Sequence, residues 1–278
     1  YINPAYTQDP TLATTGIPSR SKSFSQLQPK LSLNWKLSDD FSMYASYGYG
    51  FRSGGFNQSG VGAVAFANNI LGVKDLFDAE VADTLEFGLK SKLSSRLSLD
   101  FSVYDTQAKG SYFFVFLAAN STQNLGNLKK VDYKGYELSL NARLTDTFNL
   151  VFGYGATDSD IKDAVDPITI GKQAPLVTHD TTNVGAHYRK PFGSNGLELE
   201  LRADYQRLGK TWWEPYNVTV RNPVNLLDLR AGVRGKDWSV TAWERNANNT
   251  QYNAEFSPGG FVFKAKPARW GIDYTRQF

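Results

Sequence analysis

The side chains best suited to chemistry in this 278-residue sequence are two histidines, His179 beside Asp180 and His187 further along. A histidine next to a carboxylate is a pairing that general-base hydrolysis uses. The sequence has no HExxH pair and no GxSxG turn, the spacings by which metallohydrolases and serine hydrolases present their reactive groups. It also has no cysteine, which excludes thiolate metal ligands and cysteine nucleophiles. The pattern therefore predicts a protein that is not an enzyme and has no metal site and no cofactor.

Glycines recur in pairs, Gly48 with Gly50 and Gly153 with Gly155. A phosphate-binding loop would need a helix directly after such glycines, and no helical pattern follows either pair. Small residues that let a sheet bend, or let another domain approach it, are the expected role.

Composition narrows the class further. The 30 basic and 27 acidic residues give a formal net charge of +3, too even to predict a nucleic-acid partner. Mean hydropathy is −0.40, and no run reaches the roughly 18–20 apolar residues of a membrane-spanning helix. Yet 14% of the residues are aromatic, which is high for a chain this polar. The fold has to explain where those rings lie.

Apolar and polar side chains alternate with a period of two along most of the chain. In the first such segment Leu31, Leu33 and Trp35 share one face, and a turn at residues 38–40 leads into the next segment. The same unit recurs to the C-terminus, and we count eleven strands of about ten residues.

Short turns alternate with long loops along these strands. The long loops are expected at residues 52–81, 107–130, 157–178, 207–223 and 246–267. Soluble sandwiches have shorter strands and no reason for this alternation. We predict an all-β fold, a portion of an antiparallel transmembrane β-barrel with short periplasmic turns and long extracellular loops.

The aromatic positions indicate which face meets lipid. On the apolar face, rings gather near both ends of the strands. Those near the short turns are Trp35, Phe41, Phe148, Tyr188, Trp238 and Phe278, and those near the long loops are Tyr49, Phe51, Tyr136, Tyr154, Tyr205 and Trp270. Two aromatic girdles around an aliphatic band predict a lipid-facing apolar side. The charged face then lines a hydrated lumen, where its ions need not be buried.

An odd strand count is itself informative. Bacterial single-chain barrels have even strand numbers, and an eleven-stranded sheet would leave two unpaired edges in lipid. We therefore expect that the chain lacks the beginning of its barrel.

Several segments, taken in order from about residue 28 to the end, carry a family likeness. They are residues 29–36, 43–47, 50–57, 80–91, 133–138 and 238–243, then Asn246, Tyr252, Gly271 and the terminal Phe278. This ordered set resembles the TonB-dependent outer-membrane receptors, whose 22-stranded barrel closes around an N-terminal plug. The resemblance implies that residues 1–278 are the C-terminal portion of such a barrel, with plug and TonB box absent.

The resemblance also implies location and partners. These are the outer membrane of a Gram-negative bacterium and its lipid, the TonB complex acting through the missing plug, and the barrel-assembly machinery. The machinery would read the C-terminal strand, with Tyr274 and Phe278 as its signal. The function implied is active uptake of a scarce ligand, a ferric siderophore being the commonest class.

Ligand contacts would come from the extracellular loops, where exposed rings offer stacking area at low entropic cost. The candidates are Arg52, Phe56, Tyr112, Phe113, Phe114, Trp212, Trp213 and Tyr216; Arg52, Lys109 and Arg221 would attract an anionic complex. The alternative is that these rings pack the loops. Two other functions stay open: an outer-membrane barrel enzyme of protease or lipase type, and a soluble carbohydrate-binding β-protein.

Overall fold

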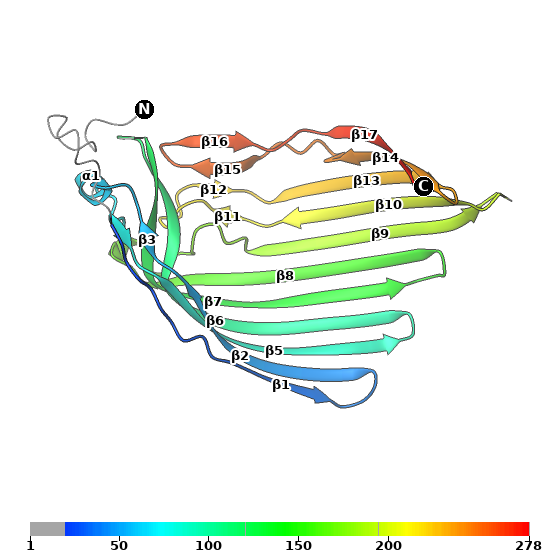
Figure 1. Ribbon diagram of the computed structural model, residues 1–278, viewed down its shortest axis with the longest axis horizontal. Coiled ribbons are helices and arrows are strands. Elements are labelled where there is room, and N and C mark those ends of the chain that lie inside the picture. The colour runs from blue at the N-terminus through cyan, green and yellow to red at the C-terminus, as the bar shows by residue number, and fades with distance from the viewer. Residues whose placement is uncertain (1–19, 120, 194, 278) are drawn as a thin grey trace.

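The computed structural model describes residues 20–119, 121–193 and 195–277 and shows one curved antiparallel sheet (Figure 1). In order across the sheet its strands are β1 (Lys30–Lys36), β2 (Phe41–Arg52), β5 (Glu80–Ser94), β6 (Leu97–Leu117), β7 (Thr122–Arg143), β8 (Phe148–Asp163), β9 (Asp180–Phe192), β10 (Leu197–Leu208), β13 (Val224–Arg234), β14 (Trp238–Arg245) and β17 (Arg269–Arg276). The order follows the chain, so the sheet is an up-and-down meander. The prediction of an all-β fold with eleven long strands is confirmed.

Cross-strand register places the apolar side chains on one face of the whole sheet. One row runs through Leu33, Ala45, Phe87, Val103 and Tyr136, each directly opposite the next. The large members of this row are exposed. An apolar face of this extent needs a non-aqueous neighbour, which is what the predicted lipid contact would supply.

Side-chain hydroxyls help to close the short turns. At the first turn the backbone N–H of Leu37 donates to the carbonyl of Phe41 (3.0 Å), and Ser38 Oγ accepts from the N–H of Asp40 (3.2 Å). Thr145 Oγ1 accepts from the N–H of Thr147 in the same way (3.2 Å). Serine and threonine bond their own backbone in turns, so local sequence is enough to place these reversals.

Two of the expected loops are wrong in extent. Residues 107–130 are mainly strand, because β6 and β7 remain paired as far as Leu117 opposite Thr122. Likewise, β8 runs on to Asp163, inside the loop expected at 157–178. The extension is rich in aromatic and β-branched residues, which favour strands once a partner satisfies the backbone. The sequence predicts a loop here because turn-forming residues surround these segments, and the pairing between two strands is not visible in local sequence.

The remaining elements are short and lie in the long loops. They are β3 (Gly55–Phe56) with β4 (Leu76–Phe77), α1 (Val61–Ala67), η2 (Pro167–Thr169), β11 (Thr211–Trp212) with β12 (Val220–Arg221), and β15 (Asn253–Ser257) with β16 (Phe261–Lys264). Within the described ranges no helix combines the length and apolar character needed to cross a membrane.

The buried hydrophobic cluster sits at the loop end of the sheet, where strand ends and loop segments pack together. Its members come from α1, the outer parts of β6, β7 and β8, and nearby loop segments: Val61, Ala65, Val73, Phe113, Leu117, Leu128, Val131, Ile161, Ala164 and Ala174. The sheet itself is a single layer, with neither face covered over most of its area. The loops therefore supply their own packed support for anything they bind.

Candidate ligand-binding vestibule

Two hairpins from distant parts of the sheet meet above its loop end. The β6–β7 extension rises away from the sheet and its tip lies near β15–β16 (Figure 1). Phe114 and Phe116 of β6 make edge contacts with Phe261 of β16, with ring centroids 6.4 and 6.1 Å apart. Because β6 is an interior strand and β15–β16 joins the last two strands, this contact bridges the mouth of the curved sheet.

Arg52 and Tyr112 are brought together, but both are committed to other groups. Arg52 forms an ion pair with Glu80, and its guanidinium lies 4.0 Å from the centroid of the Tyr112 ring. The Tyr112 hydroxyl donates to the carbonyl of Ser53 (2.7 Å). The charge of Arg52 is therefore compensated by Glu80. A ligand would meet the edge of the Tyr112 ring here rather than a free cation.

Phe56 is the predicted ring with the clearest access, at 39% exposed. The Arg20 guanidinium lies 4.6 Å above it. The next residue, Asn57, donates to the carbonyls of Lys74 and Leu125 (both 2.7 Å). This buried amide ties the loop to β7, so Phe56 stands on a fixed support.

Phe113 and Trp213 are not exposed, contrary to the expectation for them. They retain only 6% and 7% of their accessible surface. Phe113 lies in the loop core, where a side chain on Gly126 would overlap its ring. Trp213 packs edge-on against Phe256 (6.3 Å). For these two rings the packing alternative holds, because loop closure needs apolar volume that the single-layer sheet does not provide.

Trp212 and Tyr216 are partly exposed and held by polar contacts. Trp212 Nε1 donates to Gln173 Oε1 (3.1 Å), and Lys210 Nζ lies 4.3 Å from its ring centroid. The Tyr216 hydroxyl donates to Asp166 Oδ2 (3.0 Å). Burial, helped by this hydrogen bond, raises the pKa of Tyr216 to about 12.

Arg221 differs from Arg52 because no carboxylate of the described chain lies within 4.0 Å of it. It is half-buried, and its Nη2 donates to Thr211 Oγ1 (2.8 Å). Burial lowers the pKa of this guanidinium. Of the cations expected in the loops, Arg221 is thus one that keeps an uncompensated charge.

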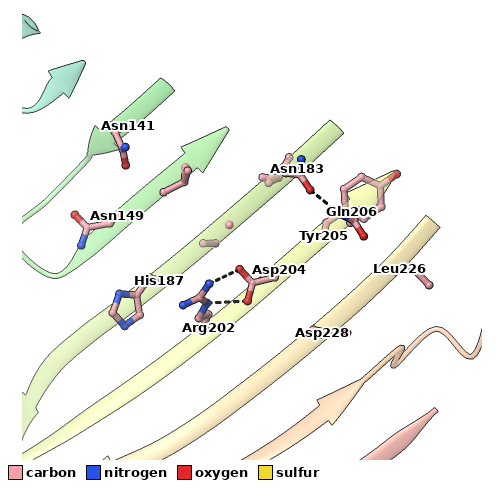
Figure 2. A pocket seen from close by; sticks show the side chains of 14 residues that line it. Asn141, Asn149, Asn183, His187, Arg202, Asp204, Tyr205, Gln206, Leu226 and Asp228 are labelled. Atoms are coloured by element: carbon pink, nitrogen blue, oxygen red, sulfur yellow. Dashed lines mark hydrogen bonds and ion pairs between the residues drawn. The ribbon is translucent and has the colours of Figure 1, made fainter. Parts of the chain in front are cut away.

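The concave face carries a polar hollow of about 660 Å³ below these loops (Figure 2). Its labelled polar lining comes from β7, β8, β9, β10 and β13: Asn141, Asn149, Asn183, His187, Arg202, Asp204, Tyr205, Gln206 and Asp228. Arg202 forms a bidentate pair with Asp204 (2.7 and 3.0 Å), and Gln206 donates to Asn183 (3.1 Å). Sequence periodicity predicts these residues on one face, except Tyr205, which it predicts on the apolar face. Only the register shows which of them adjoin.

The histidines do not build a hydrolytic site in the described ranges. His179 Nδ1 lies 3.5 Å from Asp180, but that carboxylate also pairs with Arg207. His187 Nε2 lies 3.0 Å from Glu200 Oε1. No serine of the described chain hydrogen-bonds to His179, and no group of three or more potential ligands there could hold a metal.

A family model described as "TonB dependent receptor-like, beta-barrel" matches residues 4–247. No protein of curated function matches the sequence.

Solved receptors share the fold at low identity. BauA, the ferric preacinetobactin receptor of Acinetobacter baumannii, aligns with a TM-score of 0.67 and 19% identity, covering 89% of this chain and 35% of its own. FyuA, the ferric yersiniabactin uptake receptor of Yersinia pestis, aligns with a TM-score of 0.66 and 16% identity, covering 90% of this chain and 37% of its own. FpvA, the pyoverdine outer-membrane receptor of Pseudomonas aeruginosa, aligns with a TM-score of 0.65 and 16% identity, covering 90% of this chain and 36% of its own.

The chain thus spans little more than a third of the length of these receptors. The family and these neighbours are transport receptors rather than enzymes, in agreement with the absence of hydrolase spacings from the sequence. The family model covers most of the chain, and the eleven-stranded meander is the fold that the receptors share with it. This chain belongs to the TonB-dependent receptor-like β-barrel family.

Proposed function

We propose that residues 1–278 form the C-terminal barrel portion of an outer-membrane receptor that takes up a scarce ligand, a ferric siderophore, with energy from TonB. The observation that carries this proposal is a sheet with one exposed apolar face and one polar face that contains a hollow. At the loop end of the sheet, two hairpins contact each other through aromatic rings. Such a wall suits lipid outside and a hydrated passage inside.

The loop residues would bind the ligand before transport. Phe56, Phe114 and Trp212 keep accessible ring area, while Tyr112, Tyr216 and Arg52 border the same mouth with their polar groups engaged. Phe113 and Trp213 would act beneath the surface, by supporting the loops. No chemical step is required of this chain, since uptake needs binding and a coupled conformational change.

Other partners follow from the same proposal. A plug domain would dock against the polar concave face and couple it to TonB. The barrel-assembly machinery would meet β17, where Tyr274 is exposed on the apolar face. The other half of that proposed signal, Phe278, lies outside the described residues.

Uptake of a labelled ferric siderophore tests the proposal. The full-length natural gene is expressed in a Gram-negative strain that lacks its own siderophore receptors, with and without TonB. We expect the protein in the outer-membrane fraction and uptake only when TonB is present. A Trp212→Ala variant should bind the complex more weakly at equal protein level. A protein recovered from the soluble fraction, or uptake that is indifferent to TonB, would contradict the proposal.

A further inference from the structure

Two arginines face each other at the loop end of the last two strands. Arg245 of β14 lies directly opposite Arg269 of β17 in the antiparallel ladder. The neighbour of Arg269, Trp270, belongs to the apolar face and is 76% exposed. Successive side chains of a strand point to opposite faces, so Arg269 and Arg245 point to the concave side. Both arginines are exposed there.

Neither arginine forms an ion pair with an acid in the part of the chain that the structure describes. Among the residues that the structure describes, no carboxylate lies within 4.0 Å of either guanidinium. The concave-facing acids on the flanking strands are Asp228, which accepts from the N–H of Asn246 (2.9 Å), and Asp273, which lies opposite Thr241. Like charges directly opposite each other destabilise an antiparallel pair.

The position of Arg245 is set by an aromatic support. Trp243 lies opposite Gly271 and covers it so closely that any side chain on Gly271 would overlap the indole ring. The Arg245 guanidinium lies 5.6 Å from the centroid of that ring. A cation over an indole face is attracted by the ring quadrupole, so Arg245 is held along the concave wall.

The adjoining loops add positive charge without compensation. Residues 207–223 and 246–267 contain one acid each, Glu214 and Glu255. The Glu214 carboxylate accepts from the backbone N–H groups of residues 216, 218 and 219. Lys210, Lys264, Lys266 and Arg221 make no ion pair with a described carboxylate. This side of the mouth therefore has a surplus of cations.

We infer that Arg245 and Arg269 form an anion subsite that takes a carboxylate group of the incoming ligand. The inference rests on the proposed function, since it assigns the chemical class of the ligand that this mouth admits. Guanidinium forks match carboxylates with paired, charge-assisted hydrogen bonds, and a bound anion removes the repulsion between the two arginines. The site faces the lumen, so a dissolved ligand reaches it and a lipid does not.

Malonate tests the subsite, with neutral malonamide of the same shape as the matched probe. Protein expressed from its natural gene is purified in detergent, and its melting temperature is followed against probe concentration at constant ionic strength. Ligand that binds only the folded state raises that temperature. We expect malonate to stabilise and malonamide not to. Arg245→Gln and Arg269→Gln should each weaken malonate binding about tenfold.

Two further variants make the test specific. Arg245→Lys, which keeps the charge and loses the fork, should fall between wild type and Arg245→Gln. Arg96→Gln, an arginine paired with Asp146 at the opposite end of the sheet, should match wild type. An Arg245→Gln variant that still responds to malonate like wild type would overturn the inference, and so would equal stabilisation by malonamide.

Separate arms distinguish the inference from the proposed function. Malonate binding that depends on both arginines, in a protein whose iron uptake is indifferent to TonB, would leave the subsite standing and remove the transport role. TonB-dependent uptake, with malonate binding unchanged in both variants, would support the transport role and overturn the subsite.

A further arm tests whether lipid reaches the two arginines, because lipopolysaccharide carries phosphate anions on the membrane side. Competition by added lipopolysaccharide would place the arginines against lipid and overturn the lumenal site.

Discussion

At the scale of single residues, accessibility divides the vestibule rings into two groups. Phe113 is buried in the loop core, whereas Phe56 keeps 39% of its surface. The sequence predicts both as candidates for stacking on a ligand, because it reveals a ring in a loop but not what covers that ring. The two side chains should therefore respond differently to truncation.

Phe113→Ala should lower the free energy of unfolding of the loop region by about 3–5 kcal/mol, because it leaves a cavity beneath α1. Phe56→Ala should change that free energy by about 1 kcal/mol or less and weaken ligand binding instead. Hydrogen exchange of the loop amides checks both variants. Equal loosening of the loops in both would show that Phe56 is also structural.

Tyr216 makes a pH-dependent contribution to the same loops. Its pKa is raised from 10.0 to about 12, first by burial and then by the hydrogen bond to Asp166. The folded state therefore holds the phenol proton more tightly than the unfolded state does, and its contribution is complete below about pH 10. Loop stability should fall as pH rises from about 10 through 12. Tyr216→Phe should remove that slope, measured by tyrosinate absorbance and loop proteolysis.

At the scale of elements, tyrosines lying across glycines shape the concave face. Tyr104 of β6 lies opposite Gly135 of β7, and Tyr44 of β2 lies opposite Gly88 of β5. A side chain on either glycine would overlap the tyrosine ring. The hydroxyls continue the contact, Tyr44 donating to Glu86 and Tyr104 sharing a hydrogen bond with Thr157. The two tyrosine rings are thereby laid along the concave face of the sheet.

Gly135→Ala should destabilise the β6–β7–β8 region by about 1–3 kcal/mol, since the added methyl group displaces a fixed ring and a neighbouring carbonyl. Gly153→Ala is the matched control on β8, where the added atom would meet only the Asn183 Cβ at 3.9 Å. Urea unfolding in detergent compares the two variants. A Gly153→Ala variant as unstable as Gly135→Ala would refute the role of the tyrosine.

At the scale of the whole molecule, the two faces of the sheet differ in polarity. Leu140 lies in the apolar rows between Leu99 and Phe152. The next residue, Asn141, lines the polar hollow on the other face. A position in mid-membrane and a position in a hydrated lumen differ sharply in how they accept a charge.

Leu140→Arg should therefore cost about 2–4 kcal/mol of folding free energy in a bilayer, while Asn141→Arg should be mild. Folding yield into lipid vesicles, followed by heat-modified electrophoretic mobility, measures the difference. Equal tolerance of the two substitutions would argue against a lipid-facing side.

Much of this molecule follows from local sequence. The period-two alternation and the turn residues at 38–40 and 145–147 predicted eleven strands, their faces and the turn end, and the structure confirms the strands. Alternation and turn chemistry act between residues close in sequence, so a single chain displays them. The length of the β6–β7 hairpin is different, because its outer half is strand only where two segments pair.

Tertiary structure alone decided which residues meet. The burial of Phe113, the aromatic bridge to Phe261 and the opposition of Arg245 and Arg269 each join segments that the chain separates. The sequence by itself determined a β-meander with its apolar side chains mainly on one face, because side chains alternate between the two faces in any extended strand. Register and loop packing determined the vestibule, because they depend on hydrogen bonds and contacts between strands, which no local pattern contains.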